Sequence, residues 1–239
     1  MKGMKTATNS DGYATLVGAT ADPVVLTVIG EQLFVLLVPR VSEPYAGMHG
    51  LPGGFVDFDQ AGGHAEHPRQ AALRKLAEKT GLSEPYVEEI GVFAAPGRDP
   101  RGLLWSVAYL ALVPASELPD DSDAAWHPVD DLPPLAFDHA DIIAAGLELA
   151  RGKLWLSNIA VGLLPAEFTF TEARRVFTAI SGITPNPRNF GRDLNLTGLV
   201  EPGDGPPRRS GPGPGANASV WRFRERTPAW GRAYTKRMS

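Results

Sequence analysis

AALRKLAEKTGL, residues 71–82, is the stretch that decides the fold of the first half of the chain. Pro68 suits the first position of a helix and Gly81 is a typical helix stop, so the sequence predicts a helix over residues 68–80. Its apolar residues recur at helical spacing and form one stripe for burial: Ala72, Leu73, Leu76 and Ala77. The side of the helix opposite to this stripe is charged.

Four charged residues of this helix share one face. At about 100° per residue they span an arc of roughly 140°, and they are Arg74, Lys75, Glu78 and Lys79. Charges gathered on one side of a short helix are typical of a metal-binding helix. Lys75 and Lys79, however, have the wrong sign to hold a metal cation, so the helix is a damaged site, a converted site or no site.

The loop LPGGFVDF at residues 51–58, followed by this helix, closely resembles the Nudix box. In the family a glycine and a glutamate precede the helix pattern Arg-Glu-apolar-x-Glu-Glu-x-Gly-apolar. The residues that match the pattern are Glu66, Arg74, Leu76, Glu78, Gly81 and Leu82. The resemblance implies a site for a nucleoside diphosphate derivative, in which helix carboxylates hold the divalent metals that activate water.

The departures from the family pattern fall on the chemistry. Lys75 stands where the family has its first helix glutamate, and Lys79 stands at the second glutamate of the Glu-Glu pair. Between Gly54 and Glu66 lie 11 residues instead of five, so the loop is longer by six. Only Glu66 and Glu78 remain to hold a cation. We therefore predict no catalytic residues, no metal site and little or no hydrolysis.

The lysines leave alternatives open. They could supply the positive charge that metals supply in an enzyme, so that the site binds a pyrophosphate without activating water and requires no cofactor. They could also be ordinary surface residues on a degenerate helix. In the rival case of an active ADP-ribose or nucleotide pyrophosphatase, the longer loop would provide a replacement carboxylate, for which Asp57 and Asp59 are the candidates.

The segment PGRDPRG at residues 96–102 supports a retained ligand site. It resembles a loop of the ADP-ribose-directed members of the superfamily, and its arginines could pair with phosphates by bidentate hydrogen bonds. Trp105 could stack on a base, although a strand tryptophan is more often part of the core. The predicted ligand-binding residues are Gly53, Gly54, Glu66, Arg74, Lys75, Glu78, Lys79, Arg98 and Arg101.

The chain has 239 residues and no cysteine, which excludes a disulfide framework, a thiolate nucleophile and a cysteine-based zinc site. Its net charge of −4 is the sum of an acidic and a basic part of the chain. Residues 1–150 hold 9 Lys/Arg against 21 Asp/Glu, a net −12, whereas residues 151–239 hold 14 against 6, a net +8. This division predicts a basic module that binds a polyanion. Neither export nor membrane insertion is indicated, and the cytoplasm is the expected location.

Residues 1–154 have the pattern of an α/β or α+β domain. A β-hairpin is predicted over residues 23–39 and a strand over residues 102–114, while the acidic residues 115–135 are expected to form a surface connection. Asp138 is the predicted N-cap of a second helix that runs over residues 139–153. Strands before and after an amphipathic helix fit the Nudix fold that the box implies.

Residues 155–239 have a different pattern. Thr169 and Glu172 form a capping box before one helix, and Asn186-Pro187 begins a second helix that ends near Gly198. A hairpin follows, whose tip within residues 202–218 is rich in Gly and Pro and is expected to be flexible. This order predicts a winged helix-turn-helix. The predicted DNA-binding residues are Arg174, Arg175, Arg188, Asn189, Arg192, Arg208, Arg209 and Arg222.

A Nudix-like domain, the junction RGKLWLSNIAVGLLPAEFTFTEARRVF and a winged helix with NPRNFGRDLNLTGLVEP together resemble the Nudix-related transcriptional regulators of NAD metabolism. The resemblance covers nearly the whole chain. It implies a homodimeric repressor whose domain 1–154 senses the ligand and dimerises, and whose domain 155–239 binds a palindromic operator upstream of NAD synthesis or salvage genes. The implied effector is ADP-ribose or a related NAD metabolite.

Two points remain open beside this resemblance. Gly191 lies where similar proteins often carry a basic residue, which removes a charge and costs the helix roughly 1 kcal/mol relative to alanine. Besides the pyrophosphatase, a second alternative is a metabolite-binding scaffold whose basic half docks another protein. The sequence itself does not decide the operator, the physiological metabolite, or whether the ligand releases or promotes DNA binding.

Overall fold

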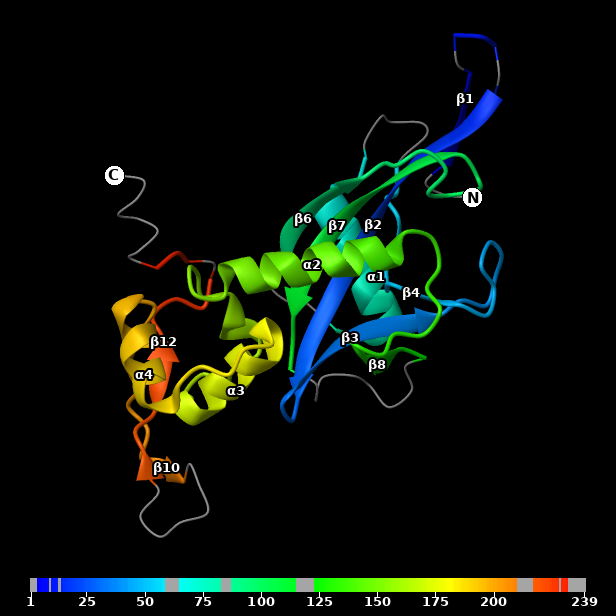
Figure 1. Cartoon of the computed structure of the whole chain (residues 1–239). Coiled ribbons are helices and arrows are strands. Elements are labelled where there is room, and N and C mark those ends of the chain that lie inside the picture. Colours follow the sequence, from blue (N-terminus) through cyan, green and yellow to red (C-terminus); the bar gives the residue numbers. More distant parts are fainter. Residues whose placement is uncertain are drawn as a thin grey trace. The chain divides into compact units, whose positions relative to one another are not determined.

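The computed structural model of the chain (Figure 1) describes residues 4–8, 10–12, 14–58, 65–82, 87–114, 123–209, 217–227 and 229–231. The structure divides into two compact units. The first comprises residues 1–26, 34–111 and 116–146, and the second comprises residues 27–33, 112–115 and 147–239. Within the described residues, no helix is both long enough and apolar enough to cross a membrane.

A β-sheet forms the centre of the first unit. Its main path runs β4-β3-β2-β7-β6, with the bounds β2 Ala14–Ile29, β3 Gln32–Pro39, β4 His49–Gly50, β6 Val87–Phe93 and β7 Leu103–Leu112. Three further strands pair antiparallel with this path: β1 Met4–Thr8 and β5 Gly54–Phe55 pair with β2, and β8 Ala125–Pro128 pairs with β3. Val24, Val25 and Leu26 are all fully buried, so both faces of β2 are covered at this point.

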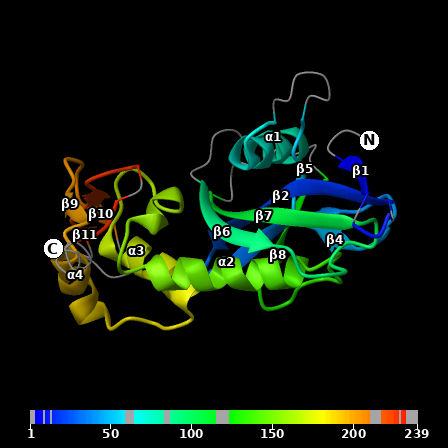
Figure 2. The same ribbon diagram turned by 90° about the horizontal axis from the view of Figure 1, so that it is seen from above.

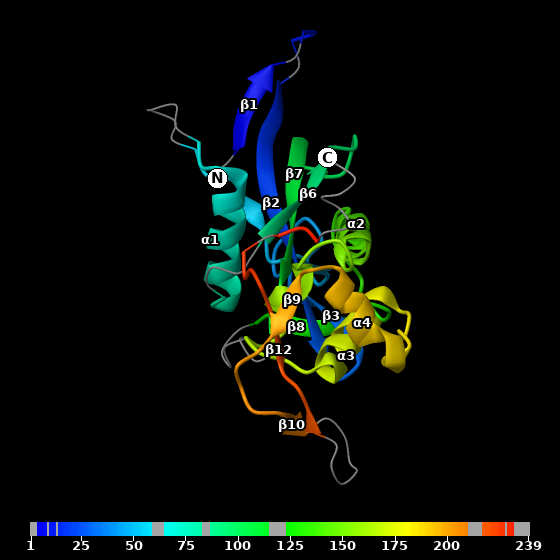
Figure 3. The ribbon, with the colours of Figure 1, turned by 90° about the vertical axis from the view of Figure 1, so that its left-hand side faces the viewer.

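Two helices cover the two faces of the sheet. Figures 2 and 3 show α1, Pro68–Thr80, on one face and α2, His139–Lys153, on the other. The bounds of both helices confirm the prediction. Gly81 closes α1 in the left-handed conformation, with φ 71°. In α2, the absent side chain of Gly146 leaves room for Val24, whose methyl carbon would lie 3.1 Å from a Cβ there.

The strand predictions were only partly right. The hairpin over residues 23–39 is confirmed, with Gly30 in its turn at φ 66°, but β2 begins earlier, at Ala14. Residues 115–135 are not only a surface connection, because β8 lies within them and pairs with β3 from Phe34 to Leu37. Its short sequence AWHP carries no alternating pattern, and pairing with an existing strand stabilises it. Residues 115–122 lie outside the described part of the chain.

The second unit contains the predicted winged helix. After a 3-10 turn, η2 Ile159–Gly162, the elements are α3 Phe170–Ser181, α4 Pro187–Leu196, β9 Val200–Pro202, β10 Arg208–Arg209, β11 Asn217–Ala218 and β12 Trp221–Phe223. The Thr169 capping box is present, and the Asn186 side chain caps α4 by accepting from the backbone N–H of Arg188. β9 pairs with β12, and β10 pairs with β11. Within the segment 202–218, whose tip was predicted to be flexible, residues 210–216 lie outside the described residues, as does the tail at residues 232–239.

Aromatic rings fill the core of the winged helix. The Phe190 ring of α4 packs edge-on against Phe177 of α3, with ring centroids 5.2 Å apart, and against Trp155 at 5.6 Å. Gly191 faces this core, because a Cβ built there would lie 2.5 Å from the ring of Phe170. From the sequence, Gly191 was expected only to remove a positive charge and to weaken the helix. The structure shows that the residue also makes room for an aromatic side chain.

Candidate functional site

Arg74 is the centre of the charged face of α1. Its guanidinium donates to both carboxylate oxygens of Glu66, at 2.8 and 2.6 Å, and to Glu78 at 3.1 Å. It also donates to the Phe55 carbonyl and lies 3.4 Å from Asp57. The hydrogen bond from Arg74 is the largest cause that holds the pKa of Glu66 below its usual value. Arg74 therefore holds Phe55 of the Gly-rich loop and Glu66, two residues before the helix, against α1.

The two lysines are also engaged within the protein. Lys75 Nζ lies 2.6 Å from Glu78 Oε2, and this contact is the largest cause that lowers the pKa of Glu78. Lys79 is exposed as a residue, but its ammonium reaches inward and donates to the Gly53 carbonyl at 2.5 Å. Desolvation there lowers the pKa of Lys79, and the negative charge of Asp22 partly opposes the shift.

The described residues around α1 do not form a site for a divalent cation. Among the described residues, no group of three or more His, Cys, Asp or Glu side chains is placed to hold a metal. Glu66 and Glu78 both accept from Arg74, and Glu78 also accepts from Lys75. The possible replacement carboxylate Asp57 lies beside Arg74 as well, and Asp59 is outside the described residues. Each of the carboxylates described here thus has a cation of the chain beside it.

The two glycines of the loop make close approaches of different kinds. A Cβ on Gly53 would lie 2.0 Å from Asp22 Oδ1 and 2.5 Å from the Ala21 carbonyl oxygen, so its backbone packs directly on β2. A Cβ on Gly54 would instead meet the flexible methylenes of Lys75, the nearest at 2.9 Å. A side chain at position 53 would therefore clash with a rigid neighbour, whereas one at position 54 would meet a side chain that can move.

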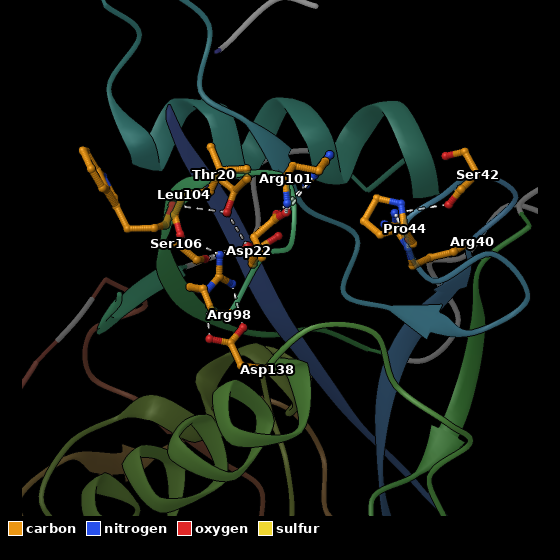
Figure 4. Close-up of polar contacts among 12 residues, drawn as sticks. Thr20, Asp22, Arg40, Ser42, Pro44, Arg98, Arg101, Leu104, Ser106 and Asp138 are labelled. Atoms are coloured by element: carbon orange, nitrogen blue, oxygen red, sulfur yellow. Dashed lines mark hydrogen bonds and ion pairs between the residues drawn. The ribbon is translucent and has the colours of Figure 1, made fainter. Parts of the chain in front are cut away.

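A cavity of about 590 Å³ opens beside this loop in the first unit. Asp22 lies in its wall and is only 5% exposed; its Oδ2 accepts from the hydroxyls of Thr20, at 2.8 Å, and Ser106, at 2.5 Å (Figure 4). His139 is buried in the same wall, and its Nδ1 accepts from the Leu51 backbone N–H at 3.0 Å. The cavity wall is therefore polar here, and hydrogen bonds fix the orientation of its side chains.

Cationic and aromatic side chains meet at another wall of the cavity. The guanidinium of Arg101 lies 5.1 Å from the ring centre of Phe55 and 5.5 Å from that of Phe137, and Arg40 lies 4.7 Å from the Phe137 ring. Arg101 is also held by two hydrogen bonds to Asp99, at 2.9 and 2.6 Å. Guanidinium groups can bind phosphate and aromatic rings can stack on a base, so this wall has the chemistry to bind a nucleotide.

The residues predicted to bind the ligand do not all face the cavity in the same way. Gly53, Gly54, Glu78, Lys79, Arg98 and Arg101 line it, whereas Arg74 and Lys75 line a neighbouring hollow over α1. Arg98 points to Asp138, to which it donates at 2.8 and 2.6 Å (Figure 4). The expectation that Trp105 belongs to the core was wrong, because this residue is 37% exposed.

Sequence reasoning missed several residues of the cavity. Asp22, Arg40, Phe137 and His139 come from three separate segments and are brought together only by the sheet and the start of α2. No local motif marks them. A usable signal existed for Asp22 alone, since a carboxylate inside a run of apolar strand residues is seldom buried without a role.

The second candidate site is the exposed surface of α4. Arg188, Asn189 and Arg192 are exposed on this helix, while Phe190 and Leu194 are buried, as the sequence predicted. Arg192 pairs with its neighbour Asp193 at 3.0 Å. The N-terminal half of the helix thus presents guanidinium and amide groups to solvent, which are the groups that read guanine and adenine in the major groove.

The arginines of the wing lie among acidic residues. Arg222 Nε donates to Glu201 at 2.9 Å and its Nη1 donates to Asp204 at 2.6 Å, while Arg224 donates to the other oxygen of Glu201 at 2.9 Å. Glu167 accepts from the backbone N–H groups of Asp204 and Gly205, which fixes the turn after β9. The remaining predicted contacts on α3 and β10 are partly or fully exposed: Arg174, Arg175, Arg208 and Arg209.

Comparison with known proteins identifies both units. Residues 20–146 match the NUDIX domain, and residues 160–223 match the NrtR DNA-binding winged helix domain. The chain is 31% identical over 191 residues to the ADPR responsive transcriptional repressor NtrR of Acinetobacter baylyi, which covers 77% of this chain and 75% of the relative. It is 37% identical over 112 residues to an ADP-ribose pyrophosphatase of Methanocaldococcus jannaschii, covering 46% of this chain and 63% of that protein.

A solved structure matches nearly the whole chain. The crystal structure of Shewanella oneidensis NrtR complexed with a 27mer DNA shares 32% sequence identity and gives a TM-score of 0.74, covering 86% of this chain and 93% of that one. The predicted fold, a Nudix domain followed by a winged helix, is confirmed. The resemblance drawn from the residues is confirmed too, and the chain belongs to the NrtR family of Nudix-related transcriptional regulators.

Proposed function

We propose that this protein is a transcriptional repressor of NAD biosynthesis or salvage genes and that ADP-ribose or a related NAD metabolite is its effector. The observation that carries the proposal is the presence of both modules in one chain that is similar along most of its length to an ADP-ribose-responsive repressor. A cavity with guanidinium and aromatic walls in the first unit, and an exposed basic helix in the second, support it.

The DNA interface of the proposal centres on α4. Arg188, Asn189 and Arg192 are assigned to base edges, because they are exposed on the N-terminal half of the second helix of a helix-turn-helix. The phosphate contacts are assigned to α3 and the wing: Arg174, Arg175, Arg208, Arg209 and Arg222. Arg222 would exchange carboxylate partners for phosphate on DNA. Its contacts to Glu201 and Asp204 keep it oriented until then.

The effector site of the proposal is the 590 Å³ cavity. Arg101 and Lys79 would face the diphosphate, and Phe55 and Phe137 would contact the base. Gly53 and Gly54 provide the close-packed loop, while Glu66, Arg74, Lys75 and Glu78 form the ion-pair network that holds this loop on α1. We assign no catalytic role to any of them, because no described carboxylate cluster is left to hold a metal and activate water.

The rival function is hydrolysis of ADP-ribose, which is favoured by the similarity of 112 residues to an archaeal ADP-ribose pyrophosphatase. Incubation with ADP-ribose and magnesium distinguishes the two functions. We expect no release of AMP and ribose 5-phosphate above the uncatalysed rate. Release that is abolished by Glu78→Gln would establish the rival.

The proposal includes the assembly and the place of action. We propose a homodimer that binds a palindromic operator with half-sites separated by about 10 base pairs or a multiple, since two-fold protein symmetry requires matching DNA symmetry. A repressor acts where the DNA is, so the protein would work in the cytoplasm at the nucleoid.

Fluorescence anisotropy with a duplex from the region upstream of the gene tests the proposal. We expect specific binding that weakens steeply with salt and changes when ADP-ribose is added. Arg188→Ala should weaken binding by about 1 to 3 kcal/mol. Arg226→Ala is the matched control, because Arg226 is an exposed arginine of the same unit that is not assigned to DNA. No binding at low salt would overturn the regulator function.

A further inference from the structure

The start of α2 is part of the effector cavity. Phe137 and His139 both line it, and Asp138 lies between them. Phe137 has φ 56°, a backbone conformation that bulky residues rarely adopt. Such a residue keeps this conformation only when its surroundings hold it there. The residues of the cavity wall therefore hold the backbone at the start of α2 in this conformation.

Contacts from three other segments hold these consecutive residues. The Phe137 ring lies beneath the guanidiniums of Arg40 and Arg101. Asp138 accepts two hydrogen bonds from Arg98, and their side chains are only 13% and 4% exposed. His139 Nδ1 accepts from the Leu51 N–H. Of these contacts, the ion pair is the one that involves two buried charges, so it depends most strongly on geometry.

Arg98 therefore differs from Arg101 in what it can do. Its Nε and Nη2 face Asp138, and its Nη1 donates to the Leu104 carbonyl at 3.4 Å. Both guanidiniums present their Nε and Nη2 edge to a carboxylate, Arg98 to Asp138 and Arg101 to Asp99, but the side chain of Arg98 is only 4% exposed and that of Arg101 is 28% exposed. Arg98 is thus placed to act through Asp138, as a positioning residue, rather than by direct contact with a ligand.

The other end of α2 belongs to the second unit. The helix is continuous over 15 residues, about 22 Å, and the division between the units falls between Gly146 and Leu147. Near its C-terminal end, Arg151 Nε donates to the Ile180 carbonyl of α3 at 3.0 Å, and Lys153 lies 4.7 Å from the ring centre of Trp230. The helix thus begins beside the cavity in the first unit, and its last residues make contacts within the second unit.

We infer that the Arg98–Asp138 pair couples the effector cavity to α2 and that α2 carries the response to the winged helix. A diphosphate that binds Arg101 draws this guanidinium away from Phe137, the residue that immediately precedes Asp138. The ion pair makes the helix follow this change as a unit. The inference rests on the proposed function, because it needs a ligand whose affinity differs between two states of the protein.

Asp138→Asn tests the inference in the full-length chain. The variant keeps the shape of the side chain and removes the charge that faces Arg98. The coupling factor is the ratio of the DNA dissociation constants measured with and without saturating ADP-ribose, and linkage makes it equal to the ratio measured in the opposite order. We expect DNA affinity without ligand and ADP-ribose affinity, by calorimetry, to stay within about threefold, and the coupling factor to fall towards 1.

Two further variants keep the test decisive. Asp141→Asn removes another carboxylate from the first turn of α2 at an exposed position, and it should leave the coupling factor unchanged. If Asp138→Asn fails to fold, Arg98→Met with Asp138→Leu replaces the whole buried pair by apolar side chains and leaves no unpaired charge. This double variant should still bind DNA and respond weakly to ADP-ribose.

The outcomes separate the inference from the proposed function. A wild-type coupling factor of 1 would overturn the proposed effector response, and the inference with it. A wild-type factor well above 1 that survives in the folded variants would overturn the inference alone. Loss of ADP-ribose binding by more than about tenfold in Asp138→Asn would also overturn it, because the pair would then belong to the ligand contact itself.

Discussion

Reversing the two lysines of α1 should create a metal site. The charged groups at this face are now balanced: Arg74, Lys75 and Lys79 lie near Glu66, Glu78 and Asp57. Lys75→Glu with Lys79→Glu changes this local charge from 0 to −4. It also restores carboxylates at the two positions where the Nudix pattern has glutamate.

The expected gain follows from Coulomb attraction. Two unit charges 4 Å apart interact by about 4 kcal/mol at an effective dielectric constant of 20. Solvent reaches this face, where Lys75 and Glu78 side chains are 25% and 47% exposed, so about 1 kcal/mol per charge is a realistic share. Four units of charge then give about 4 kcal/mol, which is about a thousandfold increase in affinity for Mn²⁺.

Electron paramagnetic resonance of free Mn²⁺ measures this binding directly and needs no enzymatic activity. The apo double variant should melt at a lower temperature than the wild type, because a carboxylate at position 79 would lie near Asp22, and Mn²⁺ should raise the melting temperature again. Arg69→Glu reverses a charge on the same helix outside the arc and is the matched control. Tight Mn²⁺ binding by the wild type, or no gain in a folded double variant, would refute the reasoning.

Two other predictions concern glycines. Gly53→Ala should destabilise the first unit by roughly 3 kcal/mol and weaken ADP-ribose binding, because the added Cβ meets a rigid neighbour. Gly54→Ala should lower the free energy of unfolding by under about 1 kcal/mol, because its neighbour is a flexible side chain. Urea unfolding measures both changes, and equal losses of stability would contradict the packing argument. Gly191→Ala should gain about 1 kcal/mol of helix propensity but lose more by crowding the ring of Phe170, so that stability and DNA affinity both fall. Thermal unfolding followed by circular dichroism measures the stability. A variant more stable than the wild type would show that the ring can move.

Local signals in the sequence predicted the helices well. The bounds of α1 follow from Pro68 and Gly81, and the capping residues Thr169 and Asn186 mark the starts of α3 and α4. These signals act within a few residues, where the chemistry of one helix end decides the outcome. The sequence could therefore give the order of elements on which the winged-helix prediction depends.

The parts that the sequence did not give depend on contacts between distant residues. Arg98 meets Asp138 across 40 positions, and Asp22 meets Ser106 across 84, so no spacing rule could pair them. The short strand β8 forms because β3 is beside it, not because of its own propensity. Gly191 illustrates the same limit, since the ring that requires it lies on another helix.

The lysines of α1 bear on which concentrations the proposed sensor would respond to. A Nudix enzyme that needs a divalent ion responds to two concentrations, that of its nucleotide and that of the free metal. Lys75 and Lys79 are part of the polypeptide, so the site carries their ammonium groups without taking up a metal ion from solution. Under the proposed function, such a sensor would respond to a single concentration, that of the metabolite, and a change in free magnesium would not alter its response.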